Sequence, residues 1–549
     1  MLSVALTAPV FAQTIPSSQL LQGLYIKEGD SLQWQMTSIV GDVPNSMGVI
    51  CETLDDPKCL AAPVNQQAMK AFLLPCSNSV TVGCIEEVYA RDENGKKYSA
   101  EFSRVIAPKL NFGTSTFSED KSTKMVAGSG VGNLWTLTGL PNEVEPLNLV
   151  VQSVLWGSRP VPGGSLWNYW SAELGIAPVR LVYGNYRANG LEFDSQTKRI
   201  TGGDTIGSNG RPDDTCAATE AGICFDRITF PKNYRFGINV RIPQPLVGFF
   251  HGRINSPTIS QVISKSGSAN LIINADPVQV PFLRERITYP FWTQEMIDFA
   301  DKNYFCPDNL RCGGTGGGLM YPGVSGSFSF DVASRFLPIV KDKATGTGDF
   351  WGVRTLSGSS EDGGNSIVRQ CISNRTDVAG IVTTNAMVYS AGPPAFNATT
   401  GALDYKVLSP HFNSTGGENT GTYDLLLRSD FARCLYGFSN APIRAEISIL
   451  GSTGEEKVAT TSIREEAGWL YLSAKGFTYS APVVRVKMAQ DKPVEQSAKK
   501  EEEKKEEAAP SSKVVKKVVA KKSITCTKGK ITKKVTGTNP KCPTGYKKR

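Results

Sequence analysis

The sequence has little histidine and no long apolar run. Only two of its 549 residues are histidines, His251 and His411. Zinc sites and Ser-His-Asp triads both draw on histidine, and no GxSxG motif frames a nucleophilic serine. No run of roughly 18 apolar residues is present, so we expect no membrane-spanning helix in the mature chain. From these shortages we predict no catalytic residue, no cofactor and no metal site, and we favour a non-enzymatic role.

A secreted hydrolase of the glycosidase type is the alternative, because such enzymes need only two carboxyl groups at a suitable separation. Four acids lie near aromatic residues or glycines, namely Asp349, Glu295, Glu361 and Asp362. Acids in loops of this kind are usually solvated, and sequence alone does not show which of them lie together. The alternative therefore stays open, with no catalytic pair assigned.

Cysteine, by contrast, is plentiful and arranged in close pairs. The twelve cysteines predict six disulfides by proximity, with Cys371 and Cys434 as the long-range pair. Zinc is the competing interpretation, but it prefers shorter C-x-x-C-like knuckles and imidazole partners. Disulfides on this scale indicate an oxidising, extracytoplasmic compartment. The short-range pairs that we predict are Cys51 with Cys59, Cys76 with Cys84, Cys216 with Cys224, Cys306 with Cys312, and Cys526 with Cys542.

The first twelve residues resemble the end of a signal peptide. Residues 2–12 form a short apolar run that ends in Val10-Phe11-Ala12, which suits signal peptidase. No Lys or Arg precedes Lys27, so the basic region that starts such a peptide is missing. We predict cleavage after Ala12 and a true start upstream of Met1. An ordinary buried first strand is the alternative.

Charge is distributed unevenly along the chain. Residues 513–549 contain thirteen Lys or Arg and no acid, whereas residues 491–512 have five basic and seven acidic residues. The whole chain carries +8, so removing the tail's +13 and the preceding segment's −2 leaves −3 for the body. Residues 491–512 have no aromatic residue and Val494 as their only large aliphatic one, so we predict a disordered linker. The basic character therefore belongs to the tail.

The body has the pattern of a mainly β protein. The 53 glycines and 32 prolines predict frequent turns and few, short helices, the best helix candidate being residues 293–302. Residues 443–449 alternate apolar and polar side chains, as a half-buried strand does. Asn94-Gly95 is a strong hairpin signal. Further strands are expected at residues 423–429, 457–463, 469–472 and 483–488.

A chain of this length exceeds one hydrophobic core, so we predict several β-sandwich-like modules stapled by disulfides. The predicted order is a signal peptide (1–12), an N-terminal disulfide-bearing β domain (13–145), a central β-rich domain (146–300), a Gly-rich β region (301–420), a small β-sandwich (421–490), a disordered charged linker (491–523) and a basic Cys-hairpin tail (524–549).

Three stretches carry a family resemblance. They are ITCTKGKITKKVTGTNPKCPTGYKKR (524–549), CIEEVYARDENGKKYSAEF (84–102) and YDLLLRSDFARCLYGFSNAPIRAEISI (423–449). The first resembles a tail of secreted and cell-surface proteins of freshwater actinobacteria, in which a Lys-rich linker precedes a Cys…CPxGYKK ending, and the other two resemble recurring pieces of such proteins. The resemblance covers about a quarter of the chain. It implies that the protein is located outside the cell or at its surface, and it assigns no catalytic residue.

Two groups of residues are candidates for binding. A compact segment with a charge of +13 associates with polyanions by counterion release. Nucleic acid is disfavoured by the compartment and by the tail's single aromatic residue, Tyr546. Tryptophans near a Pro/Gly turn are possible sugar-binding platforms, although core packing is their commoner role. The tail candidates are Lys528, Lys530, Lys533, Lys534, Lys541, Lys547, Lys548 and Arg549, and the aromatic candidates are Trp156, Trp167 and Trp170.

Taken together, these patterns predict a secreted or surface-associated structural or adhesion protein. Its basic tail is expected to bind anionic cell-wall or surface polymers, with carbohydrate as a further candidate partner. The retained alternative is a secreted, glycosidase-like hydrolase held at the surface by the same tail.

Overall fold

The computed structural model describes residues 24–26, 37–41, 50–51, 56–57, 66–141, 143, 145–160, 165–186, 188, 191–194, 196, 199–202, 216–285, 327–338, 340–356, 370–372, 375–390, 392–397, 402–437, 439, 443–450, 456–458, 460–479, 483–490, 522–528, 531–537 and 541–548. They fall into two compact units, Met1–Pro493 and Val494–Arg549. The predicted signal peptide, the helix candidate at 293–302, Glu295, Glu361, Asp362, Cys306 and Cys312 lie outside the described residues. The division of the first unit into four parts stays a prediction.

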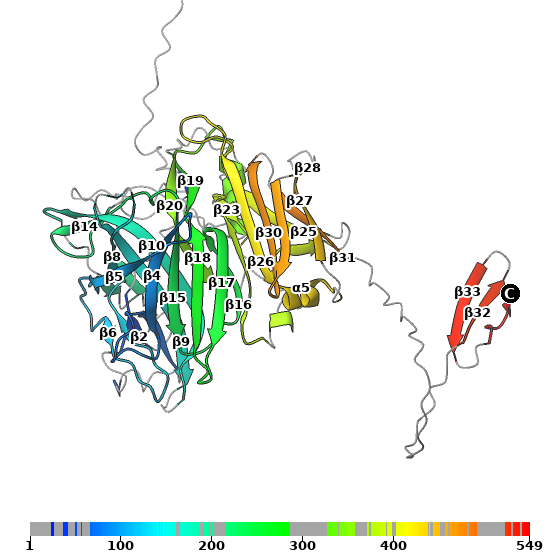
Figure 1. The fold of residues 1–549 in the computed structure, drawn as a ribbon, viewed down its shortest axis with the longest axis horizontal. Coiled ribbons are helices and arrows are strands. Elements are labelled where there is room, and N and C mark those ends of the chain that lie inside the picture. The colour runs from blue at the N-terminus through cyan, green and yellow to red at the C-terminus, as the bar shows by residue number, and fades with distance from the viewer. Residues whose placement is uncertain are drawn as a thin grey trace, which may run out of the picture. The chain divides into compact units, whose positions relative to one another are not determined.

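The first unit is mainly β and is organised around one long hairpin, made of β9 (Leu147–Pro160) and β10 (Asn168–Tyr183) (Figure 1). Both strands are longer than their neighbours, so each pairs with different strands along its length. The start of β9 pairs with β8 (Asn133–Leu137), and its end pairs with β3 (Gln66–Phe72). Likewise, β10 pairs first with β21 (Gly352–Thr355) and then with β14 (Ile223–Arg227). The hairpin therefore belongs to two sheets.

Each sheet continues outward from this hairpin by further strand pairing. In the first sheet, β3 pairs with β2 (Ile39–Gly41) on one side. On the other side the strand order from β21 is β16 (Gly248–Arg253), β22 (Val378–Thr384), β26 (Thr420–Arg428), β30 (Trp469–Thr478) and β29 (Thr460–Glu466). From β8 the second sheet runs through β5 (Lys97–Val105), β4 (Cys84–Asp92), β15 (Tyr234–Ile242) and β18 (Ala269–Asp276) to β17 (Asn255–Ile263), and from β14 it reaches β13 (Cys216–Ala217).

One hydrophobic core lies between these two sheets. Strand β18 alternates buried and half-buried residues along its whole length, as expected for a sheet with one face turned inward. Its Ile273 packs in the same cluster as Ile238 of β15, and Met69 and Leu174 join that cluster from β3 and β10 of the other sheet. Fully buried Trp351, just before β21, donates from Nε1 to the carbonyl of Ala275, 3.1 Å away. Apolar contact between two sheets is the signature of a β-sandwich.

A second sandwich uses the far end of the first sheet. A separate sheet faces β22, β26 and β30. Its strands are, in order, β23 (Val388–Tyr389), β25 (Ala402–Leu408), β31 (Val483–Gln490), β27 (Ile443–Leu450) and β28 (Glu456–Val458), and β24 (Ala395–Asn397) pairs with β25. Leu425 packs toward this second core, whereas its neighbour Leu426 belongs to the first. Because successive side chains of a strand point to opposite faces, β26 is buried on both sides and joins the two cores.

Four of the five strands predicted between residues 423 and 490 are present as β26, β27, β30 and β31, but the one predicted at 457–463 is divided between β28 and β29, which pair in different sheets. The structure adds that their facing layer also contains β23, β24 and β25, which come from residues 388–408. The Asn-Gly hairpin is confirmed as well. Gly95 has a φ of +81°, and the Asp92 carboxylate accepts hydrogen bonds from the Asn94 and Lys96 amides, both at 2.9 Å.

Shorter elements complete the described part of the first unit. β1 (Leu24–Ile26), β19 (Val278–Glu285) and β20 (Gly346–Phe350) form a small sheet, and β11 (Leu191–Asp194) pairs with β12 (Arg199–Gly202). β6 (Thr116–Phe117) pairs with β7 (Gly128–Ser129). Two helices in this part of the chain are α3 (Ser327–Phe336) and α5 (Ser429–Tyr436), and residues 370–372 are also helical. Among the described residues, no helix has the length and apolar character needed to cross a membrane.

Three of the predicted disulfides are confirmed: Cys76–Cys84, Cys371–Cys434 and Cys526–Cys542. Cys51 and Cys224 are also disulfide-bonded. Cys59 and the side chain of Cys216, their predicted partners, lie outside the described part of the chain. The long-range pair joins residues 370–372 to helix α5, next to the second core.

Candidate functional site

The basic tail folds as a small disulfide-closed sheet. Strand β32 (Lys522–Lys528) lies between β33 (Ile531–Gly537) and β34 (Lys547–Lys548) (Figure 1). The side chain of Cys526, in the central strand, is fully buried and bonds to Cys542. Because the sheet has few apolar side chains, this covalent link does much of what a hydrophobic core does in a larger domain. The tail is thus a defined platform for its charges.

The lysines of this platform are exposed on both faces. Lys533, Lys534, Lys541, Lys547 and Lys548 are all exposed, whereas Lys530, Arg549 and the side chain of Lys528 lie outside the described part of the chain. Lys533 and Lys548 both sit opposite Cys526, so they share a face. Lys534 opposes Thr525 and Lys547 opposes Thr527, which places these two lysines on the other face.

The spacing of these lysines suits a polymer of negative charges. Lys533 and Lys548 lie two strand spacings apart, or about 10 Å between backbones. This is close to the Debye length of ~8 Å at physiological salt, so the fields of neighbouring ammonium groups overlap. A small anion contacts one or two of these groups at a time, whereas a flexible polyanion reaches several at once. Simultaneous contact with several of these lysines therefore requires a ligand that carries several negative charges.

The three candidate tryptophans do not form one surface. Trp156 of β9 and Trp170 of β10 lie side by side, with ring centroids 6.2 Å apart, but Trp167 is only 1% exposed and belongs to the first core. A register shift between Tyr169 and Ser171 leaves Trp170 at an irregular position in the strand, where it is 40% exposed. Trp170 is thus the member of this group that offers substantial ring surface to solvent.

A lysine that sequence reasoning missed covers Trp156. Lys70 of β3 is the register partner of Trp156, and its Nζ lies 4.3 Å from one ring centroid of Trp156 and 5.6 Å from that of Phe72. Burial lowers the pKa of the Lys70 ammonium to about 7, against the opposing charge of Glu173. Its only sequence signal is a lysine between apolar residues in a strand, Met69-Lys70-Ala71. The cation–π contact gives Trp156 a packing role.

Both histidines have local structural contacts. His251 is buried; its Nδ1 lies 2.7 Å from the Tyr389 hydroxyl, and its Nε2 accepts a hydrogen bond from Arg354 Nε at 3.3 Å. Burial and the charges of Arg354 and Arg253 lower the pKa of His251 well below its ordinary value, so the ring is neutral at physiological pH. His411 lies 3.6 Å from the carboxylate of Glu418. His251 thus positions its neighbours rather than exchanging protons with solvent.

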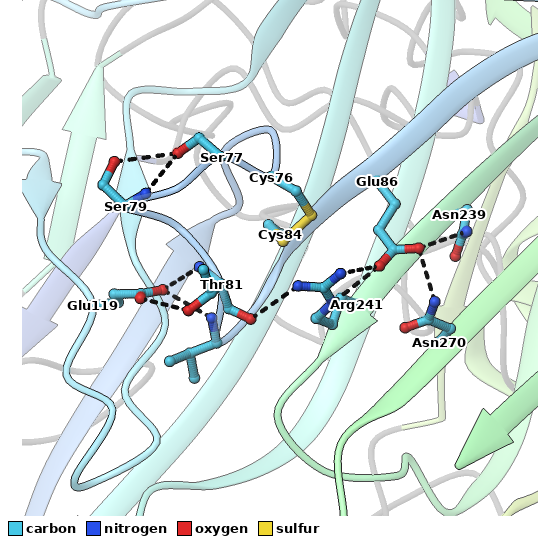
Figure 2. Close-up of a disulfide and its surroundings, with 11 residues drawn as sticks. Cys76, Ser77, Ser79, Thr81, Cys84, Glu86, Glu119, Asn239, Arg241 and Asn270 are labelled. Carbon is cyan, nitrogen blue, oxygen red and sulfur yellow. Dashed lines mark hydrogen bonds and ion pairs between the residues drawn. A yellow bond between two sulfur atoms is a disulfide. The ribbon is translucent and has the colours of Figure 1, made fainter. Parts of the chain in front are cut away.

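The Cys76–Cys84 disulfide closes a loop that is fixed by two acids (Figure 2). Glu119 accepts hydrogen bonds from the amides of Thr81 and Val82, at 2.5 and 2.8 Å, and from the Thr81 hydroxyl at 2.9 Å. On the other side, Arg241 pairs with Glu86 at 2.5 Å, and its Nη1 donates to the Thr81 carbonyl at 3.4 Å. These contacts use most of the polar capacity of both acids, so this region is structural.

Replacing Glu119 with glutamine should make this loop less stable and less sensitive to acid. Burial alone would raise the pKa of Glu119, but the hydrogen bonds from Val82 and Thr81 outweigh burial and lower it below 4.5. The ionised group therefore stabilises the fold above that value, and the contribution is lost as pH falls through the folded pKa. We expect Glu119→Gln to lose about 1–2 kcal/mol at pH 7 and to show a smaller further loss between pH 5 and 3.

Urea unfolding at pH 7, 5 and 3 measures the free energy of unfolding of the wild type and of Glu119→Gln. The control is Glu101→Gln, which replaces an exposed acid of β5. An equal acid sensitivity of Glu119→Gln and the wild type would contradict the assignment.

Comparison with known proteins adds no relative: no family model, curated protein or solved structure matches this chain. Function is therefore inferred from the residues themselves.

Proposed function

We propose that this is an exported, envelope-associated structural or adhesion protein that attaches to anionic surface polymers through its basic tail. The observation that carries the proposal is the tail sheet itself, a separate compact unit with five exposed lysines: Lys533, Lys534, Lys541, Lys547 and Lys548. The near-neutral body has no comparable excess of one charge. Attachment and the body's own role are thus assigned to different parts of the chain.

The disulfides support an extracytoplasmic compartment. Disulfides occur in the described parts of both units, and a reducing cytosol would convert them to free thiols. An extracytoplasmic address agrees with the predicted signal peptide and with the resemblance of the tail to those of actinobacterial surface proteins. In that setting the available polyanions are wall polymers, acidic polysaccharides and anionic headgroups. The retained alternative, a glycosidase-like hydrolase held by the same tail, stays a prediction.

The strength of attachment should depend steeply on salt. If each of the five exposed lysines neutralises one polymer charge, log K should fall with log salt with a slope of about −0.7 per contact, or about −3.5 for five. Raising salt from 50 to 200 mM should then weaken binding on the order of a hundredfold. Neutralising the five lysines by substitution with glutamine should remove their part of this dependence while leaving the disulfide intact.

The test compares binding of four forms of the protein to isolated cell envelopes across a salt series. These are the intact chain, a chain ending at Gln490, the five-glutamine tail variant, and a matched control. The control replaces five exposed body lysines with glutamine, at Lys109, Lys265, Lys341, Lys343 and Lys406, and so loses the same charge. We expect the control to behave like the intact chain. Equal retention of all four forms at every salt concentration would refute electrostatic attachment through the tail.

A further inference from the structure

A cleft with both polar and apolar lining residues opens at one end of the second sheet. It has a volume of about 740 Å³, within the usual range of ligand pockets. Four parts of the first unit meet there: the β4–β5 turn, the loop that precedes β15, the ends of β17 and β18, and the β19–β20 pair. The residues that the argument uses are Phe230, Tyr234, Arg235, Asp276, Gln279 and Asp349. None of them belongs to the tail or to the tryptophan group.

The apolar part of the cleft is fixed in place. Phe230 packs edge to face against Phe236, with ring centroids 4.9 Å apart, and Tyr234 packs in the same way against Tyr98 at 6.2 Å. The Tyr234 hydroxyl donates to the Pro141 carbonyl at 2.9 Å. Because both rings are held by the core, the cleft needs little rearrangement before it receives a ligand, which lowers the entropic cost of binding.

The polar groups of the cleft are also oriented. Arg235 Nη1 donates to both carboxylate oxygens of Asp276, at 3.1 and 3.2 Å, and its Nη2 donates to the Ser256 carbonyl at 2.7 Å. Across the cleft, Gln279 Nε2 donates to Asp349 Oδ1 at 3.1 Å. Arg235 Nη2 also donates to the Asn274 carbonyl at 3.3 Å, so this guanidinium is used within the protein and serves to orient Asp276. The carboxylate oxygens of Asp276 and Asp349 and the amide of Gln279 are the groups that can still accept or donate.

Burial strengthens the hydrogen bonds that these carboxyl groups offer. Partial burial raises the pKa of Asp276, against the opposing charge of Arg235, and raises the pKa of Asp349, against the hydrogen bond from Gln279. Groups in such surroundings make stronger hydrogen bonds than they would in water. Perturbed carboxyl groups gathered in a cleft are a common mark of a binding site.

The charges of the cleft restrict what it binds. The lining contains three cations, Arg91, Lys232 and Arg235, together with four carboxylates, Asp92, Glu93, Asp276 and Asp349. Such a balanced mixture repels neither sign strongly and attracts neither, so it does not suit a highly charged ligand. In the described part of the chain, no group of three or more His, Cys, Asp or Glu side chains is placed to hold a metal ion. A neutral ligand with many hydroxyl groups matches the fixed amide and carboxylates.

We propose that this cleft is a binding site for a neutral saccharide. Its hydroxyl groups would exchange hydrogen bonds with Asp349, Gln279 and Asp276, and the apolar edge of a sugar ring would touch the small exposed parts of Phe230 and Tyr234, each 8% exposed. This site is independent of the tail, because the ligand carries no charge and binding should persist in high salt. The body would then hold a saccharide while the tail holds a polyanion.

Isothermal titration calorimetry of the full chain in 1 M NaCl tests the proposal, with cellohexaose, chitohexaose and maltohexaose as probes. The high salt suppresses attachment through the tail. At least one hexasaccharide should bind with a Kd below ~10 mM, which a few hydrogen bonds supply. The five-glutamine tail variant should bind it equally well, which separates this site from the proposed attachment function.

Two substitutions locate the site. Asp349→Asn and Gln279→Ala change side chains at the cleft rim, and each should weaken binding about fivefold or more. Glu101→Gln, which removes an exposed acid from β5 outside the cleft, should leave the affinity unchanged. Thermal unfolding of each variant shows whether it is folded. Two results would overturn the proposal: no binding of any probe by the wild type, or binding lost in Trp170→Ala but retained in both cleft variants.

Discussion

Replacing both Cys371 and Cys434 with serine is expected to lower the free energy of unfolding by about 4 kcal/mol. The two cysteines are 63 positions apart, and their bridge removes much of the freedom of that loop in the unfolded chain. Cys371 is only 8% exposed and belongs to the second core, and Cys434 lies in helix α5, which packs on the same core through Phe431 and Ala432. Losing the bridge should therefore loosen the second sandwich first.

The Cys76–Cys84 bridge provides a matched comparison within the same unit. Its cysteines are only eight positions apart, so the same chain-entropy argument gives about 2.5 kcal/mol for the double serine variant. Urea unfolding of the two variants and the wild type, under oxidising conditions, measures both losses. Hydrogen exchange at residues 429–436 should rise in the Cys371/Cys434 variant alone. A larger loss from the short bridge than from the long one would contradict this account.

The local elements of this fold could be predicted from the sequence because their signals are local. Strand β27 alternates side chains with a period of two, and the Asn94-Gly95 turn needs only a residue that tolerates positive φ. The three described disulfides were predicted by proximity along the chain or by elimination. In each case the residues that predict the feature are close together in the sequence, or few other cysteines remain as partners.

The arrangement of the sheets could not be predicted, because it depends on contacts between distant segments. Glu86 and Asn239, whose side chains form a hydrogen bond between β4 and β15, are 153 positions apart. Nothing in the sequence of β9 or β10 shows that each strand serves two sheets, since the residues of a buried strand do not show which strands pair with it. The parallel pairing of β16 with β22 is equally hidden.

The two proposed binding sites differ in the same way, one being visible in the sequence and the other only in the fold. The tail lysines form a run of charge that composition alone reveals, and the structure adds their division between two faces. The cleft collects its lining from segments between residues 91 and 349. Asp349 is one of the acids that lie near glycines or aromatic residues in the sequence, but its partner Gln279 and the Arg235–Asp276 pair are visible only in the fold. A site assembled from strand ends has no local motif to find.

A buried arginine joins the two sandwiches, and replacing it should be among the most damaging changes to the chain. Arg253 of β16 is 1% exposed. Its Nη1 donates to the carbonyls of Thr384, at 3.0 Å, and Ala386, and its Nη2 donates to that of Met387 at 3.0 Å. Its guanidinium carbon also lies 4.3 Å from the Tyr389 ring centroid. One side chain thus satisfies the carbonyls of the segment that leads from β22 to β23.

Arg253→Met should cost about 3–5 kcal/mol, because it leaves buried carbonyls without donors. Arg253→Lys should be intermediate, since an ammonium group cannot reproduce the planar fork that reaches three carbonyls. Arg180→Met is the control: that guanidinium is 67% exposed and pairs with Asp226 at the surface, so its loss should be within ~0.5 kcal/mol of the wild type. Urea unfolding ranks the three variants. If Arg253→Met were as stable as Arg180→Met, the connection between the sandwiches would have to depend on apolar packing alone, through strands such as β26 that contribute to both cores.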